Sequence, residues 1–203
     1  MTTENKKDLL EAKLRQNERI YRDACSLFRG EPHVFRYYDQ TDEISIDLLT
    51  VENSPIPGTV SFSSLGLMHY PGGQRRGGKP LRIEIAAACR AEYEYVPNLL
   101  SACCFDIMNA RFSCQHGSVY RDCVNTYIQG SPMKHLLFAA ASIYWNASFP
   151  DLDFDDKSVI WMTALPISEN ELSYLEQNGA DALIDQLIRN SADLFCWARP
   201  SVL

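Results

Sequence analysis

The sequence lacks any long apolar segment. No apolar run approaches the roughly 18 residues that a membrane-spanning helix needs. The first residues, MTTENKKDLLEAK, are polar and carry both charge signs, unlike a signal peptide. Cysteine pairs at the short spacings typical of disulfide frameworks are also missing, and the seven cysteines are an odd number. We therefore expect a soluble, cytoplasmic protein with reduced thiols and no membrane contact.

Positive charge is scarce as well. The chain has 19 Lys and Arg against 26 Asp and Glu, which gives a formal net charge of -7. Without a basic stripe to contact phosphates, the sequence argues against a nucleic-acid-binding protein. An acidic surface suits a basic protein partner instead.

The clearest pattern in the chain is VIWMTALPISENELSYL. Its first seven residues, 159–165, are apolar on both alternating faces and predict a strand covered on both sides. Pro166 has no N–H for the ladder and should end this strand. Ser168 and Glu171 have the spacing of a capping box, which predicts the start of a helix. Gly179 should end that helix in a left-handed cap, with a second helix following at once.

Hydrophobic periodicity predicts most other elements. Apolar residues at helical intervals indicate helices, and alternation from His33 onwards indicates strands, the first two joined as a hairpin. The run HLLFAAASIY, His135–Tyr144, fits a helix by composition and a buried strand by length, and both remain open. The other predicted strands cover 34–37, 44–48, 59–68 and 81–87 with a short one near Val119, and the other predicted helices cover 4–28, 96–108 and 180–195.

These elements predict an α+β fold. Strands come first and then mix with helices, and several strands are linked as hairpins, so we expect a mixed, largely antiparallel sheet packed by helices. The chain length suits one domain, in which an N-terminal helix (residues 1–30) belongs with residues 31–203. The segment PGGQRRGGKP, 71–80, predicts a mobile loop. A strand follows its glycines, so phosphate binding is disfavoured.

Catalytic chemistry has little support in the sequence. Cys89 at the end of a predicted strand, with His116 or His135 as its base, would suit a small cytosolic hydrolase. However, the sequence shows no nucleophile elbow and no helix N-terminus at this thiol. A core cysteine and a structural histidine at position 135 are the favoured interpretations. We expect no catalytic residues.

Metal and cofactor sites are not expected either. Cys103, Cys104, Cys114, His116 and Cys123 invite a zinc hypothesis. Structural zinc usually takes ligand pairs two to four residues apart, whereas adjacent helical cysteines point about 100° apart. Buried helical thiols explain this group better.

One acidic loop precedes the strand at 159–165. PDLDFDD gathers four carboxylates around Phe154 and lacks the glycine and terminal glutamate of an EF-hand. A solvated loop is the simplest interpretation. The alternative is a contact patch for a cationic partner with Phe154 as an apolar anchor. The candidate partner-binding residues are Asp151, Asp153, Phe154, Asp155, Asp156 and His116.

Several segments between Arg36 and Arg199 resemble, in the same order, the suppressor-of-fused (SUFU) domain family. They are GTVSFSSLGLMHYP, LRIEIAAACR, NLLSACCFDIM, MKHLLFAAASIYW and VIWMTALPISENELSYLEQNGADAL, the last being the most specific. The resemblance implies an α+β sandwich without catalytic residues that works through protein binding. Bacterial single-domain members resemble immunity proteins, so we expect an antitoxin that neutralises a secreted toxin, with a basic nuclease as the favoured target.

Overall fold

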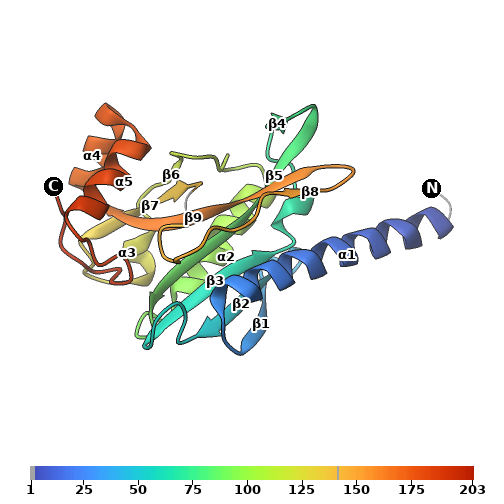
Figure 1. Cartoon of the computed structure of the whole chain (residues 1–203), viewed down its shortest axis with the longest axis horizontal. Coiled ribbons are helices and arrows are strands. Elements are labelled where there is room, and N and C mark those ends of the chain that lie inside the picture. Colours follow the sequence, from blue (N-terminus) through green and yellow to red (C-terminus); the bar gives the residue numbers. More distant parts are fainter. Residues whose placement is uncertain (1–2, 141) are drawn as a thin grey trace.

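The structure is a computed structural model that describes residues 3–140 and 142–203 (Figure 1). It is an α+β fold, as predicted. Its elements follow in the order α1 (Thr3–Phe28), β1 (Pro32–Tyr38), β2 (Ser45–Glu52), β3 (Thr59–Leu65), the 3₁₀ turn η1 (Leu67–His69), β4 (Arg75–Arg76), β5 (Lys79–Arg90), α2 (Val96–Met108), β6 (Val119–Tyr120), α3 (Val124–Tyr127), β7 (Met133–Ala139), β8 (Leu152–Asp153), β9 (Ser158–Ser168), α4 (Glu169–Asn178) and α5 (Ala180–Arg189).

All strands belong to one mixed sheet. Its main path runs β1-β2-β3-β5-β9-β7-β6, while β4 pairs with β5 and β8 pairs with β9. Every pair is antiparallel except β5–β9, which is parallel from Leu81 opposite Ser158 to Ala86 opposite Thr163. The predicted mixed, largely antiparallel sheet is therefore confirmed.

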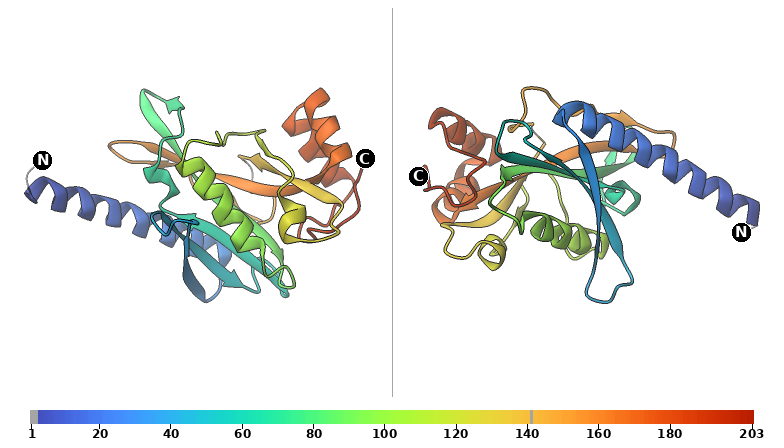
Figure 2. Two further views of the ribbon diagram at one scale, coloured as in Figure 1. Left: turned by 180° about the vertical axis from the view of Figure 1, so that it is seen from behind. Right: turned by 90° about the horizontal axis from the view of Figure 1, so that it is seen from below.

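Helices cover both faces of the sheet, which gives two hydrophobic clusters (Figure 2). On one face, α2 packs against apolar side chains of β2, β3 and β5. On the other face, the C-terminal half of α1 and the α4–α5 pair cover the sheet. Successive residues of β9 alternate between the clusters, with Met162 in the first and Trp161 in the second. The prediction that this strand is covered on both sides is confirmed.

The strand β9 does not end at Pro166 as predicted but continues to Ser168. Pro166 lies opposite Leu136 of β7. Its carbonyl accepts a hydrogen bond from Arg199 Nη2 at 3.2 Å, on the side away from β7. The N–H and C=O of one strand residue point to the same side. The proline nitrogen therefore faces away from the ladder, where no donor is needed.

The capping box at Ser168 is confirmed. The Glu171 N–H donates to Ser168 Oγ at 3.2 Å, and the Ser168 N–H donates to Glu171 Oε2 at 3.0 Å. Helix α4 ends at Gly179, as predicted, and α5 follows directly. The conformation of Gly179 differs from the prediction. Its φ of 87° is positive, but its ψ of 166° lies outside the left-handed helical region.

The last helix is shorter than predicted, because α5 ends at Arg189 instead of residue 195. The Ser191 N–H bonds to the Ile188 carbonyl and the Ala192 N–H to the Leu187 carbonyl, the two bonds of a Schellman motif. Ser191 takes the left-handed position with φ 51°. Glycine is the usual residue at this position, so the serine did not indicate that the helix ends here.

The structure settles or corrects four other assignments. The open run at 135–144 begins as strand β7, and Ala141 lies outside the described residues. The predicted loop 71–80 contains the short β4–β5 pairing, and the third strand ends at Leu65. The short helix α3 was not predicted. No helix in the described parts of the chain is long and apolar enough to cross a membrane.

Candidate protein-binding surfaces

The acidic loop lies beside the β4–β5 hairpin, and three of its four aspartates contact cations. Arg76 Nη1 is 2.6 Å from Asp151, Lys79 Nζ is 2.9 Å from Asp153, and Lys157 Nζ is 3.2 Å from Asp156. Hydrogen bonds from Lys79 and Ser158 hold the pKa of Asp153 below its usual value. Asp155 is exposed. The charge of this loop is therefore largely balanced by its neighbours.

A hollow of about 450 Å³ separates this loop from the N-terminal half of α1. Phe154 and Asp155 line one side, and Leu9 and Ala12 line the other. Phe154 is half-buried, and its carbonyl accepts a hydrogen bond from Lys79 Nζ at 2.8 Å. The apolar anchor expected at Phe154 is thus only partly accessible.

His116 lies apart from the acidic loop and Phe154. Its Nδ1 accepts a hydrogen bond from the Ala140 N–H at 3.2 Å, and its Nε2 lies 3.2 Å from Asp181 of α5. The loop aspartates make their contacts with β4, β5 and α1. The six candidate residues therefore form two separate surface features.

The proposed cysteine–histidine pair is not assembled. Cys89 is buried among core residues, and burial raises the pKa of its thiol to about 12, which disfavours the nucleophilic thiolate. His135 is buried; its Nδ1 accepts the Asp122 N–H at 2.9 Å, and its Nε2 lies 3.4 Å from Glu169. His135 is thus a structural histidine with both ring nitrogens occupied.

Four of the other thiols are core residues. Burial raises the pKa of Cys103 and Cys104 well above the ordinary value, and Cys114 and Cys123 are also buried. All seven cysteines are free. Within residues 3–140 and 142–203, no group of three or more His, Cys, Asp or Glu side chains is placed to hold a metal ion.

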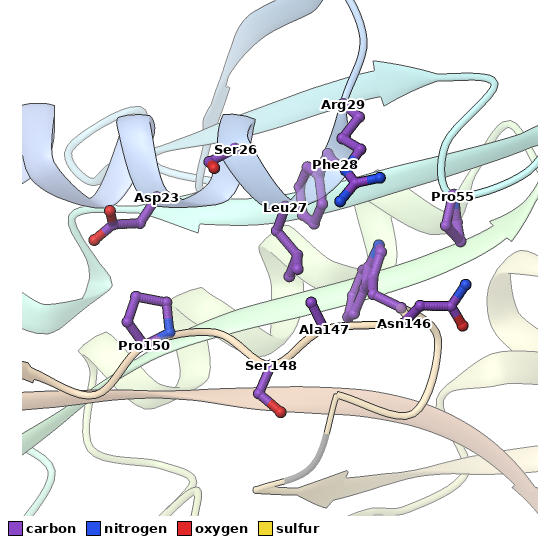
Figure 3. A pocket seen from close by; sticks show the side chains of 11 residues that line it. Asp23, Ser26, Leu27, Phe28, Arg29, Pro55, Asn146, Ala147, Ser148 and Pro150 are labelled. Atoms are coloured by element: carbon purple, nitrogen blue, oxygen red, sulfur yellow. The ribbon is translucent and has the colours of Figure 1, made fainter.

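A second hollow, of about 350 Å³, lies between the end of α1 and residues 145–150 (Figure 3). Its floor contains Phe28 and Trp145, whose rings stack with centroids 5.2 Å apart. Asp23 and Arg29 are the charged residues at its rim. Neither this hollow nor the one beside the acidic loop contains Cys89, His116 or His135.

Sequence reasoning did not predict the burial of Glu84, which lies in the predicted strand 81–87. The carboxylate is fully buried on β5 and accepts backbone N–H groups of Gly66, Leu67 and Met68 at 3.0, 3.3 and 3.1 Å, besides the Ser64 hydroxyl. Burial raises its pKa to about 7, although these hydrogen bonds act in the opposite direction. The available signal was a lone carboxylate in the otherwise apolar run from Ile83 to Cys89.

A buried ion pair holds the C-terminal segment to α4. Arg199 Nη1 and Nη2 lie 2.6 and 2.9 Å from the two oxygens of Glu171. Glu171 also accepts the Val202 N–H at 3.0 Å, so the capping-box carboxylate serves three partners. Sequence reasoning found the cap and missed the arginine because 28 residues separate the two.

The β1–β2 hairpin forms a second candidate surface at the edge of the sheet (Figure 2). Val34, Phe35 and Tyr38 of β1 are 47, 52 and 56% exposed. The hairpin was predicted from its alternation, but its exposure was not. In the described chain five carboxylates of this region make no ion pair: Glu31, Asp39, Asp42, Glu43 and Glu52.

The structure defines an α+β domain with one mixed sheet and helices on both of its faces. The family model for the suppressor of fused protein (SUFU) matches residues 42–200. The chain is also 38% identical over 188 residues to Immunity protein YqcF of Bacillus subtilis (strain 168), an alignment that covers 93% of this chain and 97% of the relative. The chain therefore belongs to the SUFU family.

Solved structures share the fold at low identity. A SUFU homologue from Neisseria gonorrhoeae matches with a TM-score of 0.65 and 15% identity, covering 95% of this chain and 93% of that one. A Sufu–Fu complex structure matches with a TM-score of 0.64 and 13% identity, covering 91% of each chain. These structural matches support the fold assignment alone.

Proposed function

We propose that this protein is an immunity protein, an antitoxin without enzymatic activity that binds and neutralises a cognate toxin. The similarity to Immunity protein YqcF carries this proposal, because the aligned region includes nearly the whole of both chains. Complex formation in the cytoplasm would keep the toxin inactive where it is made. The net charge of -7 favours a toxin with a basic surface, and a nuclease is the type we expect.

The hydrolase alternative has no support in the geometry. The thiol of Cys89 is buried with a raised pKa, and the hydrogen bonds of His116 and His135 go to other groups. Neutralisation should therefore depend on stoichiometric binding and not on turnover.

Co-expression tests this proposal directly. The C-terminal domain encoded by the gene immediately upstream should arrest growth of a bacterial host when expressed alone. Co-expression of this protein should restore growth, and calorimetry with the two purified proteins should show saturable binding at a fixed ratio.

The matched control is Cys89→Ser, checked for folding by circular dichroism. This variant should restore growth as well as the wild-type chain does. Absence of binding by the wild-type chain would overturn the proposed function. Loss of rescue in a folded Cys89→Ser variant, with binding retained, would favour the enzymatic alternative.

A further inference from the structure

The outer edge of β1 has open hydrogen-bonding groups. The Asp39 N–H donates to the Ile44 carbonyl at 3.0 Å, which fixes the phase of the β1–β2 ladder. Paired and unpaired positions alternate in an antiparallel ladder, so the backbone groups of Val34, Arg36 and Tyr38 point away from β2. In the described parts of the chain, no strand pairs with this edge. These groups can therefore pair with an added strand.

This edge also lacks the usual protections. Natural edge strands are kept short, bulged, or interrupted by proline or lysine. The opposite edge, β6, follows that rule with two residues, whereas β1 has seven in unbroken register with β2. Its proline stands at the first position, and its one cation, Arg36, forms a two-bond ion pair with Asp47 at 2.7 and 2.9 Å. The edge is thus long and accessible.

Apolar side chains lie on both faces of β1. Phe35 lies opposite Leu48 and next to His33, with ring centroids 6.4 Å apart. Val34 and Tyr38 lie on the other face, where Val34 is opposite Leu49. A strand added at this edge would contact Phe35 with one set of its side chains and Val34 and Tyr38 with the other. Backbone pairing with alternate side-chain contacts is the pattern of strand addition.

The strand added at this edge could come from a second copy of this chain or from a different protein, and the local charge favours a different protein. Residues 29–52 contain two cations and six carboxylates, and five of these carboxylates have no ion-pair partner within the described chain. Two copies joined along β1 would bring these like charges together, which disfavours a homodimer. A basic partner would gain from the same charges.

The acidic loop differs in this respect. Residues 151–157 contain four carboxylates and one cation, and residues 75–82, which lie against them, add four cations. The loop is dense in Asp, but its neighbourhood carries no negative excess. The hairpin combines an open edge, exposed apolar side chains and unbalanced negative charge.

We propose that the outer edge of β1 is the binding site for an extended segment of the basic toxin. This inference rests on the proposed function. Backbone groups at positions 34, 36 and 38 pair with the toxin segment, and Val34, Phe35 and Tyr38 bury its apolar side chains. The turn carboxylates Asp39, Asp42 and Glu43 attract its cations.

Val34→Pro tests the backbone part of the proposal, with Val34→Ala as the matched control. The Val34 N–H points to solvent, so proline should leave the β1–β2 ladder intact while removing an edge donor and blocking close approach. The probe is the purified C-terminal domain encoded by the upstream gene. We expect Val34→Pro to weaken binding by roughly 30-fold or more and Val34→Ala by only about 3-fold.

Two further variants keep the test decisive. Val34→Lys retains the N–H and adds a cation facing a basic segment, so it should also weaken binding by about tenfold or more, even if the proline variant fails to fold. The loop variant with Asp151, Asp153, Asp155 and Asp156 all changed to Asn should alter affinity by less than about twofold. Hydrogen exchange should show the amides of Val34, Arg36 and Tyr38 exchanging freely alone and protected in the complex.

The outcomes separate the two proposals. Wild-type binding with no protection at β1 and equal affinities for the Val34→Pro and Val34→Ala variants would overturn the edge site and leave the immunity function standing. Absence of wild-type binding would overturn both. A concentration-dependent dimer in light scattering that Val34→Pro abolishes would show that a second copy occupies this edge, which contradicts the choice of a basic toxin.

Discussion

The strands β9 and β1 have similar residues and opposite surroundings. Both are rich in β-branched and aromatic types, yet β9 lies between β5 and β7 with helices on both faces. In the described parts of the chain, β1 has β2 as its one neighbouring strand. Most of β9 is buried and most of β1 is exposed. Strand propensity therefore specifies the local conformation, while the neighbours decide whether apolar side chains stabilise the fold or remain available to a partner.

The largest effect is expected at the centre of the sheet. Trp161→Ala should lower the free energy of unfolding by about 3–5 kcal/mol. The indole stacks on Phe149 with centroids 4.7 Å apart, and its Nε1 donates to Ser63 Oγ at 3.1 Å. Urea denaturation measures the change. A loss below about 1 kcal/mol would contradict the central position of β9.

Glu84, paired in register with Trp161, should make the centre of the sheet sensitive to pH. Its pKa rises from 4.5 to about 7 on folding, so the folded state binds the proton more tightly between these values. The contribution of this group to stability is therefore full below about pH 4.5 and falls as pH rises to 7. The loss should be about 3 kcal/mol.

Urea denaturation of the wild type and of Glu84→Gln across pH 4.5 to 7.5 isolates the contribution of Glu84 to the free energy of unfolding, because both proteins share all other titrating groups. The stability of the wild type relative to the variant should decrease as pH rises. A difference that is constant with pH would show that the pKa of Glu84 is the same in the folded and unfolded states.

The smallest effect on stability is expected at the edge. Phe35→Ala should cost less than about 1 kcal/mol, because the ring is already 52% exposed. The same variant should weaken toxin binding by about tenfold, since truncating a buried aromatic anchor typically costs more than 1 kcal/mol of binding energy. A stability loss as large as that of Trp161→Ala would show that β1 is part of the core.

Local patterns predicted most of the fold because their signals lie within a few residues. Alternation located β1 and β2, and the Ser168–Glu171 spacing located the start of α4. The errors came from contacts distant in the sequence. Pro166 is tolerated because its nitrogen faces away from β7, and Glu84 is buried because the turn after β3 supplies its donors.

The contacts of the candidate residues could not be predicted from the sequence for the same reason. The aspartates of the acidic loop are neutralised by Arg76 and Lys79, which lie 75 and 74 residues earlier in the sequence than their partners. Conversely, the alternation of β1 looks like that of any half-buried strand. Its exposure became visible only when the sheet order placed it at an edge.

The parallel β5–β9 pair also sets an order for events during synthesis. Leu81 pairs with Ser158, so 77 residues must be made before the two strands can meet. Bringing such distant segments together carries a loop-closure cost and slows folding. The β5–β9 pair at the centre of the sheet can therefore form only after β9 has been synthesised.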